Sequence, residues 1–340
     1  MKSIQLRDGG KVAFDEVQIP NIGKQDLLVR MKACGLCGTD IEKIHGEYTA
    51  SAPVLGHEAS GVIQEVGADI KGFAVGERVF PHHHVPCYEC YVCRNGNETM
   101  CTDYRANNLD PGGFSEFFRV PSWNVLHGGV LKLPDNVTFE QASFIEPVAC
   151  CLRNIKRCNI SEAHTILILG AGPMGLMHLQ LLLLSGNTVL VSDLSSMRLE
   201  LANRLGASMV CDPKDADIAS KVRAQTDGRG VDLAIVATGS PNAIMDGLRS
   251  VRPGGTVNLF GVPVRNSVLD YDISNIVNSE ISITPSNAAT ESETKEALGL
   301  ITQGKPNFEV LITHNFKLEE FNEAVSTATH KESVKILISS

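Results

Sequence analysis

The chain has 340 residues, of which 43% are hydrophobic and 20% are charged. This balance is typical of a globular protein rather than a disordered one, and the length predicts two domains at roughly 100 to 200 residues each. The net charge is −9 and the sequence has no Lys/Arg-rich cluster, so we expect no nucleic-acid partner. The sequence has no apolar run of roughly 18 residues, so we expect no membrane span, and its N-terminus lacks a secretory signal, so we expect a cytoplasmic protein.

Short strand-like runs punctuated by Gly and Pro fill the chain from Met1 to about Phe144. Two clear examples are LLVRMKA, which starts at Leu27, and SGVIQEVG, which starts at Ser60. Short strands separated by turn residues predict a β-rich domain.

A different pattern begins at Thr165, where apolar strands alternate with helices. The order is strand TILIL, a Gly-rich turn, helix MGLMHLQLLLLSG, strand TVLVSD, helix MRLELANRLG, and then strands SMVCD, DLAIVAT and TVNLFGV. Such alternation predicts a doubly wound parallel sheet covered by helices on both faces, an α/β fold of the Rossmann type.

The remainder, from about Ala288, has helical patterns in ETKEALGLITQG and around Leu318 to Thr327, and strand candidates in FEVLIT and SVKILIS. This segment is too small to fold alone, so we expect it to complete the first domain. We therefore predict one domain from residues 1–150 together with 288–340, and a second domain from residues 151–287.

A glycine-rich turn in ILILGAGPMGLMHL has the spacing GxGxxG, formed by Gly170, Gly172 and Gly175. It follows an apolar strand and opens a helix, which is the context that the dinucleotide fingerprint requires. The first glycine permits a tight turn, the second lets the backbone approach a pyrophosphate, and the third lets helix and strand pack closely. The helix that begins around Pro173 and Met174 offers N–H groups to the phosphates. The segment therefore predicts a bound dinucleotide.

Asp193 ends the next strand, 23 residues after the first glycine of the turn, and a carboxylate about 20 residues on is expected to bind the adenosine ribose. A carboxylate there repels a 2′-phosphate and so favours NAD over NADP. The alternative is that Asp193 caps the helix that follows it. Thr238 and Gly239 end a later strand, at the edge where parallel sheets bind ligands, or they are ordinary turn residues. We also expect Arg198 and Val262 to contact the cofactor.

Four cysteines, Cys87, Cys90, Cys93 and Cys101, have the spacing CxxCxxCx7C. Such short spacings let one loop present four thiolates to a single tetrahedral ion, and four sulfur ligands leave no position open for a substrate. The pattern therefore predicts a structural zinc site. The three histidines just upstream, His82–His84, are further candidate metal ligands, although polar loop residues are the more common reading of such a run.

A second, mixed set of metal-ligating residues is spread along the first part of the chain. Cys37 lies in GLCGTD, His57 and Glu58 lie in LGHE, and Glu146 lies in FIEP. One thiolate, one imidazole and carboxylates would leave an exchangeable position, which is typical of catalytic zinc. Neighbouring residues on an extended strand point to opposite faces, so His57 and Glu58 reach one ion only if the chain bends there. One of the two carboxylates could instead act through water.

The motifs GLCGTD, GHE, CxxCxxCx7C, FIEP and GAGPMG, followed by Asp193, occur in that order. As an ordered set they resemble the zinc-dependent medium-chain dehydrogenase/reductase superfamily, and in particular its sorbitol/threonine dehydrogenase branch. The run LPDNVTFEQASFIEPVAC is especially similar to sorbitol dehydrogenases. The resemblance implies a GroES-like catalytic domain built from both chain ends, a Rossmann domain between them, and a homodimer or homotetramer. It also implies oxidation of a secondary alcohol with NAD and two zinc ions per chain, one catalytic and one structural.

By this resemblance Cys37, His57 and Glu58 would ligate the catalytic zinc, and Glu146 would be the fourth ligand or hold a zinc-bound water. Thr39 matches the Ser or Thr that starts the family's proton relay; the alternative is that it is the N-cap of a helix beginning at DIEKIHG. Zinc lowers the pKa of a bound hydroxyl, so that an alkoxide forms near neutral pH and pushes a hydride to the nicotinamide. A hydroxyl two residues after the ligating cysteine is well placed to accept the released proton.

Two departures from the family pattern concern the substrate. Sorbitol and threonine dehydrogenases usually have His where this chain has Glu42, which we expect to be a residue of the catalytic site. Sorbitol dehydrogenases also tend to have Arg-Tyr near the position of Ser286 and Asn287. These differences argue against sorbitol itself and leave a polyol, sugar or cyclitol as the expected substrate class. The alternatives are an L-threonine or simple-alcohol dehydrogenase and, outside enzymes, an NAD-binding sensor or structural protein on the same fold.

Overall fold

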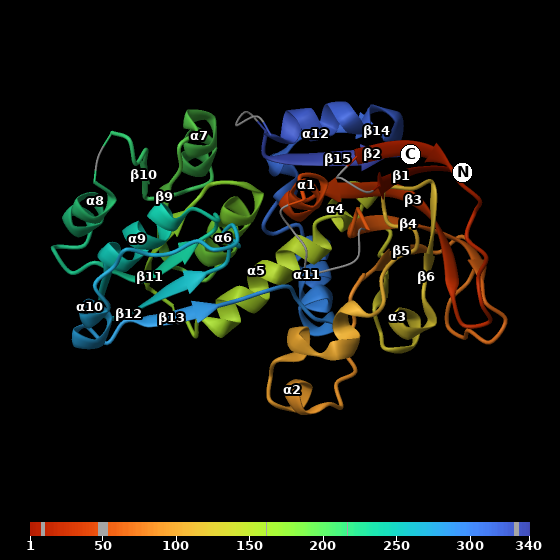
Figure 1. Ribbon diagram of the computed structural model, residues 1–340, viewed down its shortest axis with the longest axis horizontal. Helices are drawn as coiled ribbons and strands as arrows, with labels where there is room; N and C mark the ends of the chain where they lie inside the picture. Colours follow the sequence, from red (N-terminus) through yellow and green to blue (C-terminus); the bar gives the residue numbers. More distant parts are fainter. Residues whose placement is uncertain (8–10, 47–53, 161, 216, 330–332) are drawn as a thin grey trace. The chain divides into compact units, whose positions relative to one another are not determined.

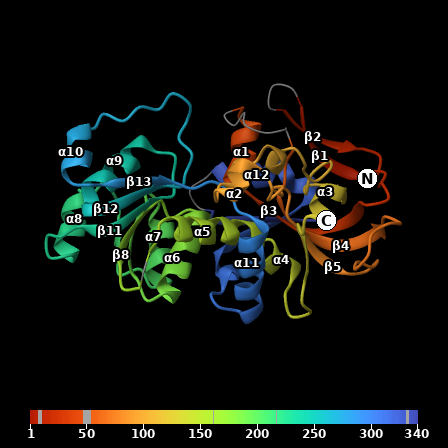
Figure 2. The same cartoon turned by 90° about the horizontal axis from the view of Figure 1, so that it is seen from below.

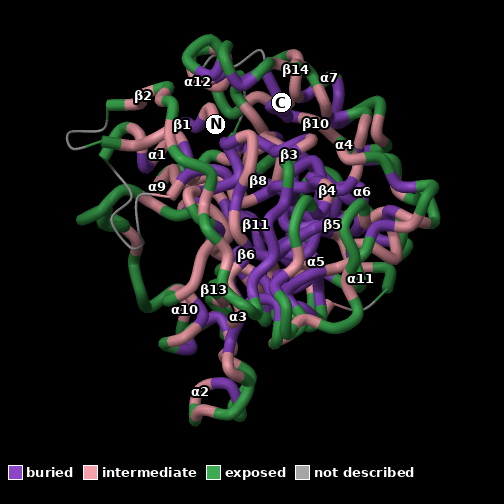
Figure 3. Tube along the Cα trace, turned by 90° about the vertical axis from the view of Figure 1, so that its right-hand side faces the viewer, coloured by how far each residue is buried: buried purple, intermediate pink, exposed green. Residues whose placement is uncertain are grey.

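The computed structural model describes residues 1–7, 11–46, 54–160, 162–215, 217–329 and 333–340. The chain divides into two compact units (Figure 1). Met1–Ala149 and Ala288–Ser340 form the first unit, and Cys150–Asn287 form the second. Buried residues follow the strands of both units (Figure 3). Within the described residues, no helix is both long enough and apolar enough to cross a membrane.

The first unit is built on a seven-stranded sheet in the order β14-β15-β3-β4-β5-β7, with β6 also paired to β3. Its strands are β3 (Leu27–Leu36), β4 (Glu58–Val66), β5 (Arg78–Pro81), β6 (Phe117–Val120), β7 (Val130–Lys132), β14 (Ile312–Lys317) and β15 (Lys335–Ser339). A separate antiparallel pair consists of β1 (Lys2–Arg7) and β2 (Lys11–Glu16). Strand β15 pairs antiparallel with β3, with Ile338 opposite Cys34, so the last strand of the chain lies beside an early one.

Helices of different lengths complete this unit. The α-helices are α1 (Gly38–Ile44), α2 (Tyr91–Arg94), α3 (Ser122–Leu126), α4 (Phe139–Ala142), α11 (Glu291–Gln303) and α12 (Phe321–Thr329). The 3-10 helices are η2 (Glu98–Met100), η3 (Thr102–Arg105), η4 (Phe308–Leu311) and η5 (Leu318–Glu320). Helix α5 (Ile145–Arg157) begins in the first unit and ends in the second.

The predicted strand FEVLIT is wrong in its first four residues, because Phe308–Leu311 form the 3-10 helix η4 and strand β14 starts only at Ile312. The side chain of Asn307 accepts a hydrogen bond from the backbone N–H of Glu309 at 3.0 Å, which starts a helical turn. Residues three apart share one side of a 3-10 helix, so Phe308 and Leu311 are both buried without a strand.

The second unit has the predicted parallel sheet, in the order β10-β9-β8-β11-β12-β13. Its strands are β8 (Thr165–Leu169), β9 (Thr188–Ser192), β10 (Met209–Cys211), β11 (Val231–Val236), β12 (Val251–Leu259) and β13 (Ser282–Pro285). Its helices are α6 (Pro173–Leu184), α7 (Ser196–Arg204), α8 (Ile218–Gln225), α9 (Pro241–Ser250) and α10 (Ile273–Asn278). Helices α6 and α7 lie on one face of the sheet and α9 on the other (Figure 2), which explains why its central strands are continuous apolar runs.

Candidate active site

Three predicted metal ligands, Cys37, His57 and Glu58, come together in the first unit. Cys37 follows β3 and is the N-cap residue of α1, while Glu58 is the first residue of β4. Strands β3 and β4 are antiparallel, with Gly35 opposite Glu58, and this pairing brings the two chain segments to the same place. One ligand atom from each of the three residues lies within 4.8 Å of the others. The arrangement can therefore hold a metal ion with sulfur, nitrogen and oxygen donors.

The bend that His57 and Glu58 require occurs at the preceding residue. Gly56 has a φ of +76°, a conformation that side chains other than glycine's rarely adopt. A Cβ atom at Gly56 would also lie only 2.6 Å from the backbone nitrogen of Phe114. Glycine is thus the residue that fits both the turn and the close approach, and the turn lets two sequence neighbours reach one point.

Asp40 holds two of these ligands in position, and the sequence reasoning missed it. Its carboxylate accepts hydrogen bonds from the backbone N–H groups of Cys37 at 3.2 Å and Gly56 at 3.0 Å. One of its oxygens also lies 3.5 Å from Nδ1 of His57. A carboxylate beside the second ring nitrogen of a ligating histidine orients the ring for metal binding. The available signal was its position three residues after the cysteine, where an acidic side chain can bond back to the N-cap backbone.

Electrostatics in this cluster favour charged side chains despite burial. Burial alone favours the neutral acid at Asp40, but the His57 ring and the hydrogen bonds around Asp40 hold its pKa below the usual value. Conversely, burial opposes a charged imidazole, yet Asp40 and Cys37 raise the pKa of His57 well above its usual value. The cluster is therefore an anionic environment that attracts a cation, whether a proton or a metal ion.

Glu58 has a buried cationic partner at the far end of the chain. Lys335 of β15 forms an ion pair with Glu58, and the two side chains are 2% and 1% exposed. Burial raises the pKa of Glu58, with Lys335 acting against that shift, and the Glu58 carboxylate raises the pKa of Lys335 although burial lowers it. Sequence reasoning did not identify Lys335, because it lies in an otherwise apolar strand.

Glu146 and the histidines occupy a second cluster. Glu146, in the first turn of α5, groups with His82 and His83, whose ligand atoms lie within 4.8 Å of its own. The ring of His83 lies 4.9 Å, centroid to centroid, from that of His57. His82–His84 lie in the loop after β5, as expected, but all three side chains are buried, which the sequence did not indicate.

The burial of His82–His84 has a local cause. The side-chain amide of Asn124 donates hydrogen bonds to the backbone carbonyls of His82 at 2.9 Å and His83 at 3.0 Å, so the loop's polar backbone is satisfied inside the protein. Burial then lowers the pKa values of His83 and His84 well below the usual value, and their positively charged neighbours act in the same direction.

Thr39 and Glu42, the other predicted catalytic residues, both lie on α1. Because Cys37 is the N-cap of this helix, the alternative role of Thr39 as the N-cap is wrong. Thr39 lies in the first turn and is partly exposed, as is Glu42 further along the helix. The structure places neither residue in the three-residue ligand cluster.

The four-cysteine loop lies around α2. Its sulfur atoms form one group, with Cys90 Sγ 3.5 Å from Cys93 Sγ and Cys101 Sγ 3.5 Å from Cys87 Sγ. Sulfur ligands of a tetrahedral zinc ion lie about 3.8 Å apart at a bond length of about 2.3 Å, so the loop is already close to that geometry. A hydrogen bond from the backbone of Cys93 is the main reason that the pKa of Cys90 falls to about 7, which favours a thiolate ligand.

In the second unit, the glycine-rich turn has the geometry that the fingerprint predicts. Gly170 has a φ of +104° directly after β8. A Cβ atom at Gly175 would lie 1.9 Å from the carbonyl oxygen of Gly170, so only glycine lets α6 pack this closely on the turn. Gly172 is the N-cap of α6 and Pro173 is its first residue, which leaves the N-terminus of the helix directed at the turn.

Asp193 follows β9 beside this turn. Its carboxylate accepts hydrogen bonds from the backbone N–H groups of Ala171 at 2.6 Å and Ser195 at 2.8 Å. The alternative role of Asp193 as a helix cap is wrong, because Ser195 is the N-cap of α7 and its side chain accepts from the backbone of Arg198.

The remaining predicted cofactor residues lie at the same carboxyl edge of the sheet. A Cβ atom at Gly170 would be 3.3 Å from the Cβ of Thr238, and one at Gly239 would be 2.4 Å from the carbonyl oxygen of Val262. The Nη1 atom of Arg198 lies 3.9 Å from the Cβ position of Gly172. The turns after three neighbouring strands therefore meet where an open α/β sheet binds its ligand.

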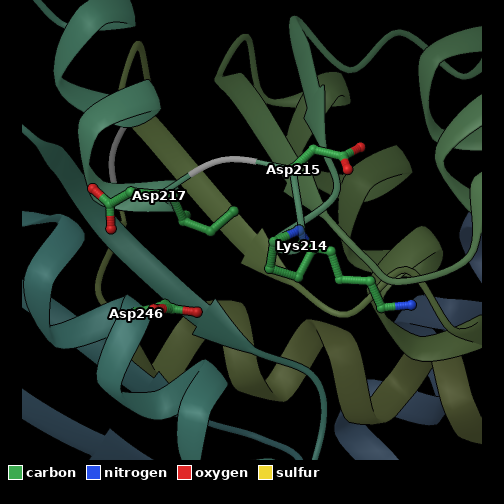
Figure 4. Close-up of a pocket in the computed structure, with 6 residues that line it drawn as sticks. Lys214, Asp215, Asp217 and Asp246 are labelled. Carbon is green, nitrogen blue, oxygen red and sulfur yellow. The ribbon is translucent and has the colours of Figure 1, made fainter.

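A pocket of about 300 Å³ follows β10 and was not anticipated from the sequence. Figure 4 shows Lys214, Asp215, Asp217 and Asp246, which line it together with Pro213 and Ile218. Three carboxylates against one ammonium group do not suit the phosphates of a dinucleotide, so we assign the pocket no part in cofactor binding.

Models of known protein families match segments in both units. Residues 23–135 match the family model described as the alcohol dehydrogenase GroES-like domain, and residues 173–303 match the one described as zinc-binding dehydrogenase. The first match includes Cys37, His57 and Glu58, and the second begins at Pro173, directly after Gly172 of the glycine-rich turn.

Individual proteins resemble the chain over nearly its whole length. A sorbitol dehydrogenase of Halalkalibacterium halodurans is 30% identical over 337 residues, covering 97% of this chain and 96% of that protein. An L-threonine 3-dehydrogenase of Pyrococcus horikoshii is 31% identical over 330 residues, covering 94% of this chain and 93% of that protein. Among solved structures, a putative zinc-binding dehydrogenase of Sinorhizobium meliloti bound to NADP has a TM-score of 0.90 at 29% identity, covering 100% of this chain and 99% of that one.

Proposed function

The chain belongs to the zinc-dependent medium-chain dehydrogenase/reductase superfamily, and on that premise we propose that it transfers a hydride from a secondary alcohol of a polyol, sugar or cyclitol to NAD. The observation that carries this proposal is the meeting of Cys37, His57 and Glu58, whose ligand atoms lie within 4.8 Å of one another. This donor set suits zinc and supplies three protein ligands, as catalytic zinc sites do, and the fourth position is open to the substrate hydroxyl when Glu146 acts through water.

Each side chain has a defined task in this proposal. Cys37, His57 and Glu58 hold the ion, and Asp40 keeps the His57 ring in the orientation that ligation needs. When bound, zinc supplies the Lewis acidity that lowers the pKa of the alcohol. Thr39, two residues after Cys37, accepts the hydroxyl proton and passes it outward. Glu146, which groups with His82 and His83, acts on the ion through water or as a fourth ligand.

The second unit binds the dinucleotide. The backbone around Gly170, Gly172 and Gly175, with Pro173 and Met174 at the start of α6, takes the pyrophosphate. Asp193 accepts hydrogen bonds from the adenosine ribose and disfavours a 2′-phosphate, which makes NAD the proposed cofactor.

NADP is the specific alternative to NAD as the cofactor. Arg198 lies close to the glycine-rich turn, and an arginine near this position can accommodate a 2′-phosphate. The Sinorhizobium meliloti structure is bound to NADP. The initial rate of alcohol oxidation should therefore be measured with both NAD and NADP.

The substrate class rests on the sorbitol dehydrogenase relative and on Glu42, whose carboxylate on α1 can accept hydrogen bonds from hydroxyl groups. The threonine dehydrogenase relative, at 31% identity, favours L-threonine as the second candidate. An NAD-binding sensor or structural protein is disfavoured, because such a protein has no need of the ligand cluster of the first unit.

Initial rates across polyols, aldoses, cyclitols, simple alcohols and L-threonine, each with NAD and NADP, test the proposal. We expect the highest kcat/KM for a polyhydroxy substrate with NAD. A kcat/KM for L-threonine far above that of every polyol would contradict the proposed substrate class. If the protein oxidised none of these alcohols, the proposed function itself would be contradicted.

We propose a homodimer or homotetramer as the working form. Exposed apolar side chains in the second unit support this, among them Val268, Ile273 and Val277, which are 84%, 71% and 71% exposed. Light scattering coupled to size-exclusion chromatography tests it, and a monomer at micromolar concentration would contradict it. The cytoplasmic location stays a prediction from the sequence.

A further inference from the structure

Glu291 is the first residue of α11, and its buried side chain contacts two segments from much earlier in the chain. The cap of this helix is formed by Thr290 and Glu293, which hydrogen-bond to each other at 2.7 Å. The carboxylate of Glu291 instead lies 2.7 Å from Nδ1 of His82, and its other oxygen accepts a hydrogen bond from the hydroxyl of Tyr88. Glu291 therefore connects α11 to the loop after β5 and to the four-cysteine loop.

Both partners of Glu291 are themselves held in place. The backbone N–H of His82 donates to the carbonyl of Gly129 at 2.6 Å, and the carbonyl of His82 accepts from the side chain of Asn124 at 2.9 Å. Tyr88 has a φ of +58°, which residues other than glycine rarely adopt. Such a conformation persists only where the surroundings determine it, so the contact between Tyr88 and Glu291 is a defined part of the fold.

The contact with Glu291 makes the two ring nitrogens of His82 different. An ionised carboxylate accepts hydrogen bonds but does not donate them, so Nδ1 carries the proton of this bond. Nε2 is buried and has no hydrogen-bond partner among the residues that the structure describes. A proton on Nε2 would be a buried donor without an acceptor, which costs free energy. The ring is therefore neutral, with a lone pair on Nε2.

This tautomer has a consequence for Glu146. One ring nitrogen of His82 and one carboxylate oxygen of Glu146 lie within 4.8 Å of each other. Because Nε2 has no proton, it cannot donate a hydrogen bond to that carboxylate. In the opposite tautomer Nε2–H would be such a donor, and it would compete with an ion or an ion-bound water for the Glu146 carboxylate.

We propose that Glu291 is a positioning residue of the active site, which fixes the proton of His82 on Nδ1 and so prevents His82 from binding the carboxylate of Glu146. This role rests on the proposed function, in which Glu146 acts on the ion through water or as a fourth ligand. Glu291 does not belong to the ligand groups found in the described part of the chain, so its effect passes through His82. All three residues lie in the first unit.

The tautomer of His82 can be measured directly by long-range proton–nitrogen NMR correlation on the zinc-loaded protein with isotope-labelled histidine. The signal of His82 is the one missing from His82→Asn or, if that variant does not fold, the one that Glu291→Gln shifts. We expect Nδ1–H in the unsubstituted protein and in Glu291→Gln, whose amide oxygen still accepts from Nδ1, and Nε2–H in Glu291→Leu. Nε2–H in the unsubstituted protein, or Nδ1–H retained in Glu291→Leu, would overturn the proposal.

Kinetics then test whether this arrangement matters to the reaction. With the best alcohol of the substrate panel, Glu291→Leu is expected to lower kcat about tenfold, and Glu291→Gln is expected to restore it. The KM for NAD is expected to stay unchanged, because the proposed dinucleotide site lies in the second unit.

Glu293→Leu is the matched control, since it removes a buried carboxylate from the cap of the same helix without touching His82. It is expected to lower thermal stability and to leave the tautomer and kcat unchanged. Equal losses of kcat in Glu291→Leu and Glu293→Leu would contradict a positioning role. Circular dichroism checks folding, and if Glu291→Leu does not fold, the tautomer in the unsubstituted protein decides.

The role of Glu291 and the proposed function fail by different readouts. If the unsubstituted protein oxidises no alcohol, the proposed function is contradicted. The wrong tautomer of His82 in a protein that does oxidise alcohols contradicts only the role of Glu291.

Discussion

Lys335 and Glu58 form a buried ion pair that joins the last strand of the chain, β15, to β4. The pair passes over Gly35 of β3, where a Cβ atom would lie 1.8 Å from Oε2 of Glu58 and 2.8 Å from Cε of Lys335. Glycine at this position therefore makes room for both charged side chains. The consequence is that a predicted metal ligand is held in place by a residue 277 positions away.

Replacing Lys335 with Met is expected to destabilise the protein strongly, because it leaves the carboxylate of Glu58 buried without its partner. Removing one member of a buried pair costs about 3 to 5 kcal/mol. Urea denaturation measures this loss in the free energy of unfolding. The control is Lys2→Met, which breaks the exposed pair with Glu319 and is expected to change stability little. Equal stability of the two variants would contradict the structural role of Lys335.

Replacing Asp40 with Asn is expected to weaken zinc binding at the first site by about 10- to 100-fold, because the ring of His57 loses its charged partner. Competition with a chromophoric chelator measures the affinity. Asp110→Asn removes a surface carboxylate that pairs with Arg119 and serves as the matched control, with unchanged affinity expected. If the two variants bind zinc equally well, Asp40 does not position His57.

The buried His178 is expected to make the second unit sensitive to acid. Burial lowers its pKa to about 4, and its ring is held neutral between the carbonyl of Met174 and the amide of Asn154. The unfolded chain takes up the proton near pH 6.5 and the folded chain only near pH 4, so this stabilisation is complete above pH 6.5 and is lost as the pH falls toward 4.

The loss attributable to His178 between pH 7 and pH 5 is about 2 kcal/mol. Denaturant unfolding at both pH values checks it, and His178→Gln is expected to reduce the difference by about that amount. An unchanged pH dependence in the variant would show that another group is responsible.

Asp193→Ser is expected to reduce kcat/KM for NAD by about tenfold or more, because a hydrogen bond to a charged group contributes roughly 1.5 to 3 kcal/mol. The value for NADP is expected to fall less or to rise, since the repulsion of the 2′-phosphate is removed. Thermal unfolding is the control, because Asp193 also bonds to the backbone of Ala171 and Ser195. Parallel losses with both cofactors would contradict a role in discrimination.

Features that depend on residues close in the sequence could be predicted from it. The four cysteines lie within one loop, and the glycines of the turn between β8 and α6 lie within six residues, so their spacing alone carries the geometry. The parallel sheet followed in the same way from the alternation of strands and helices.

Two features that depend on distant partners were not predicted from the sequence. In the sequence, Lys335 is only a charged residue in an apolar strand. The structure shows that β15 pairs with β3 and that Lys335 forms an ion pair with Glu58. His82 reads as a polar loop residue until Glu291, 209 positions later, is seen beside its ring. In both cases the sequence shows a polar residue, and only the fold shows that it is buried and what satisfies it.

Zinc content and alcohol oxidation of Cys37→Ser, measured on the same preparation, test the central claim most directly. The account predicts that the variant loses one equivalent of zinc and loses NADH formation with a polyhydroxy substrate, while circular dichroism is unchanged. A variant that binds the same amount of zinc and oxidises the alcohol at the rate of the unsubstituted protein would contradict it.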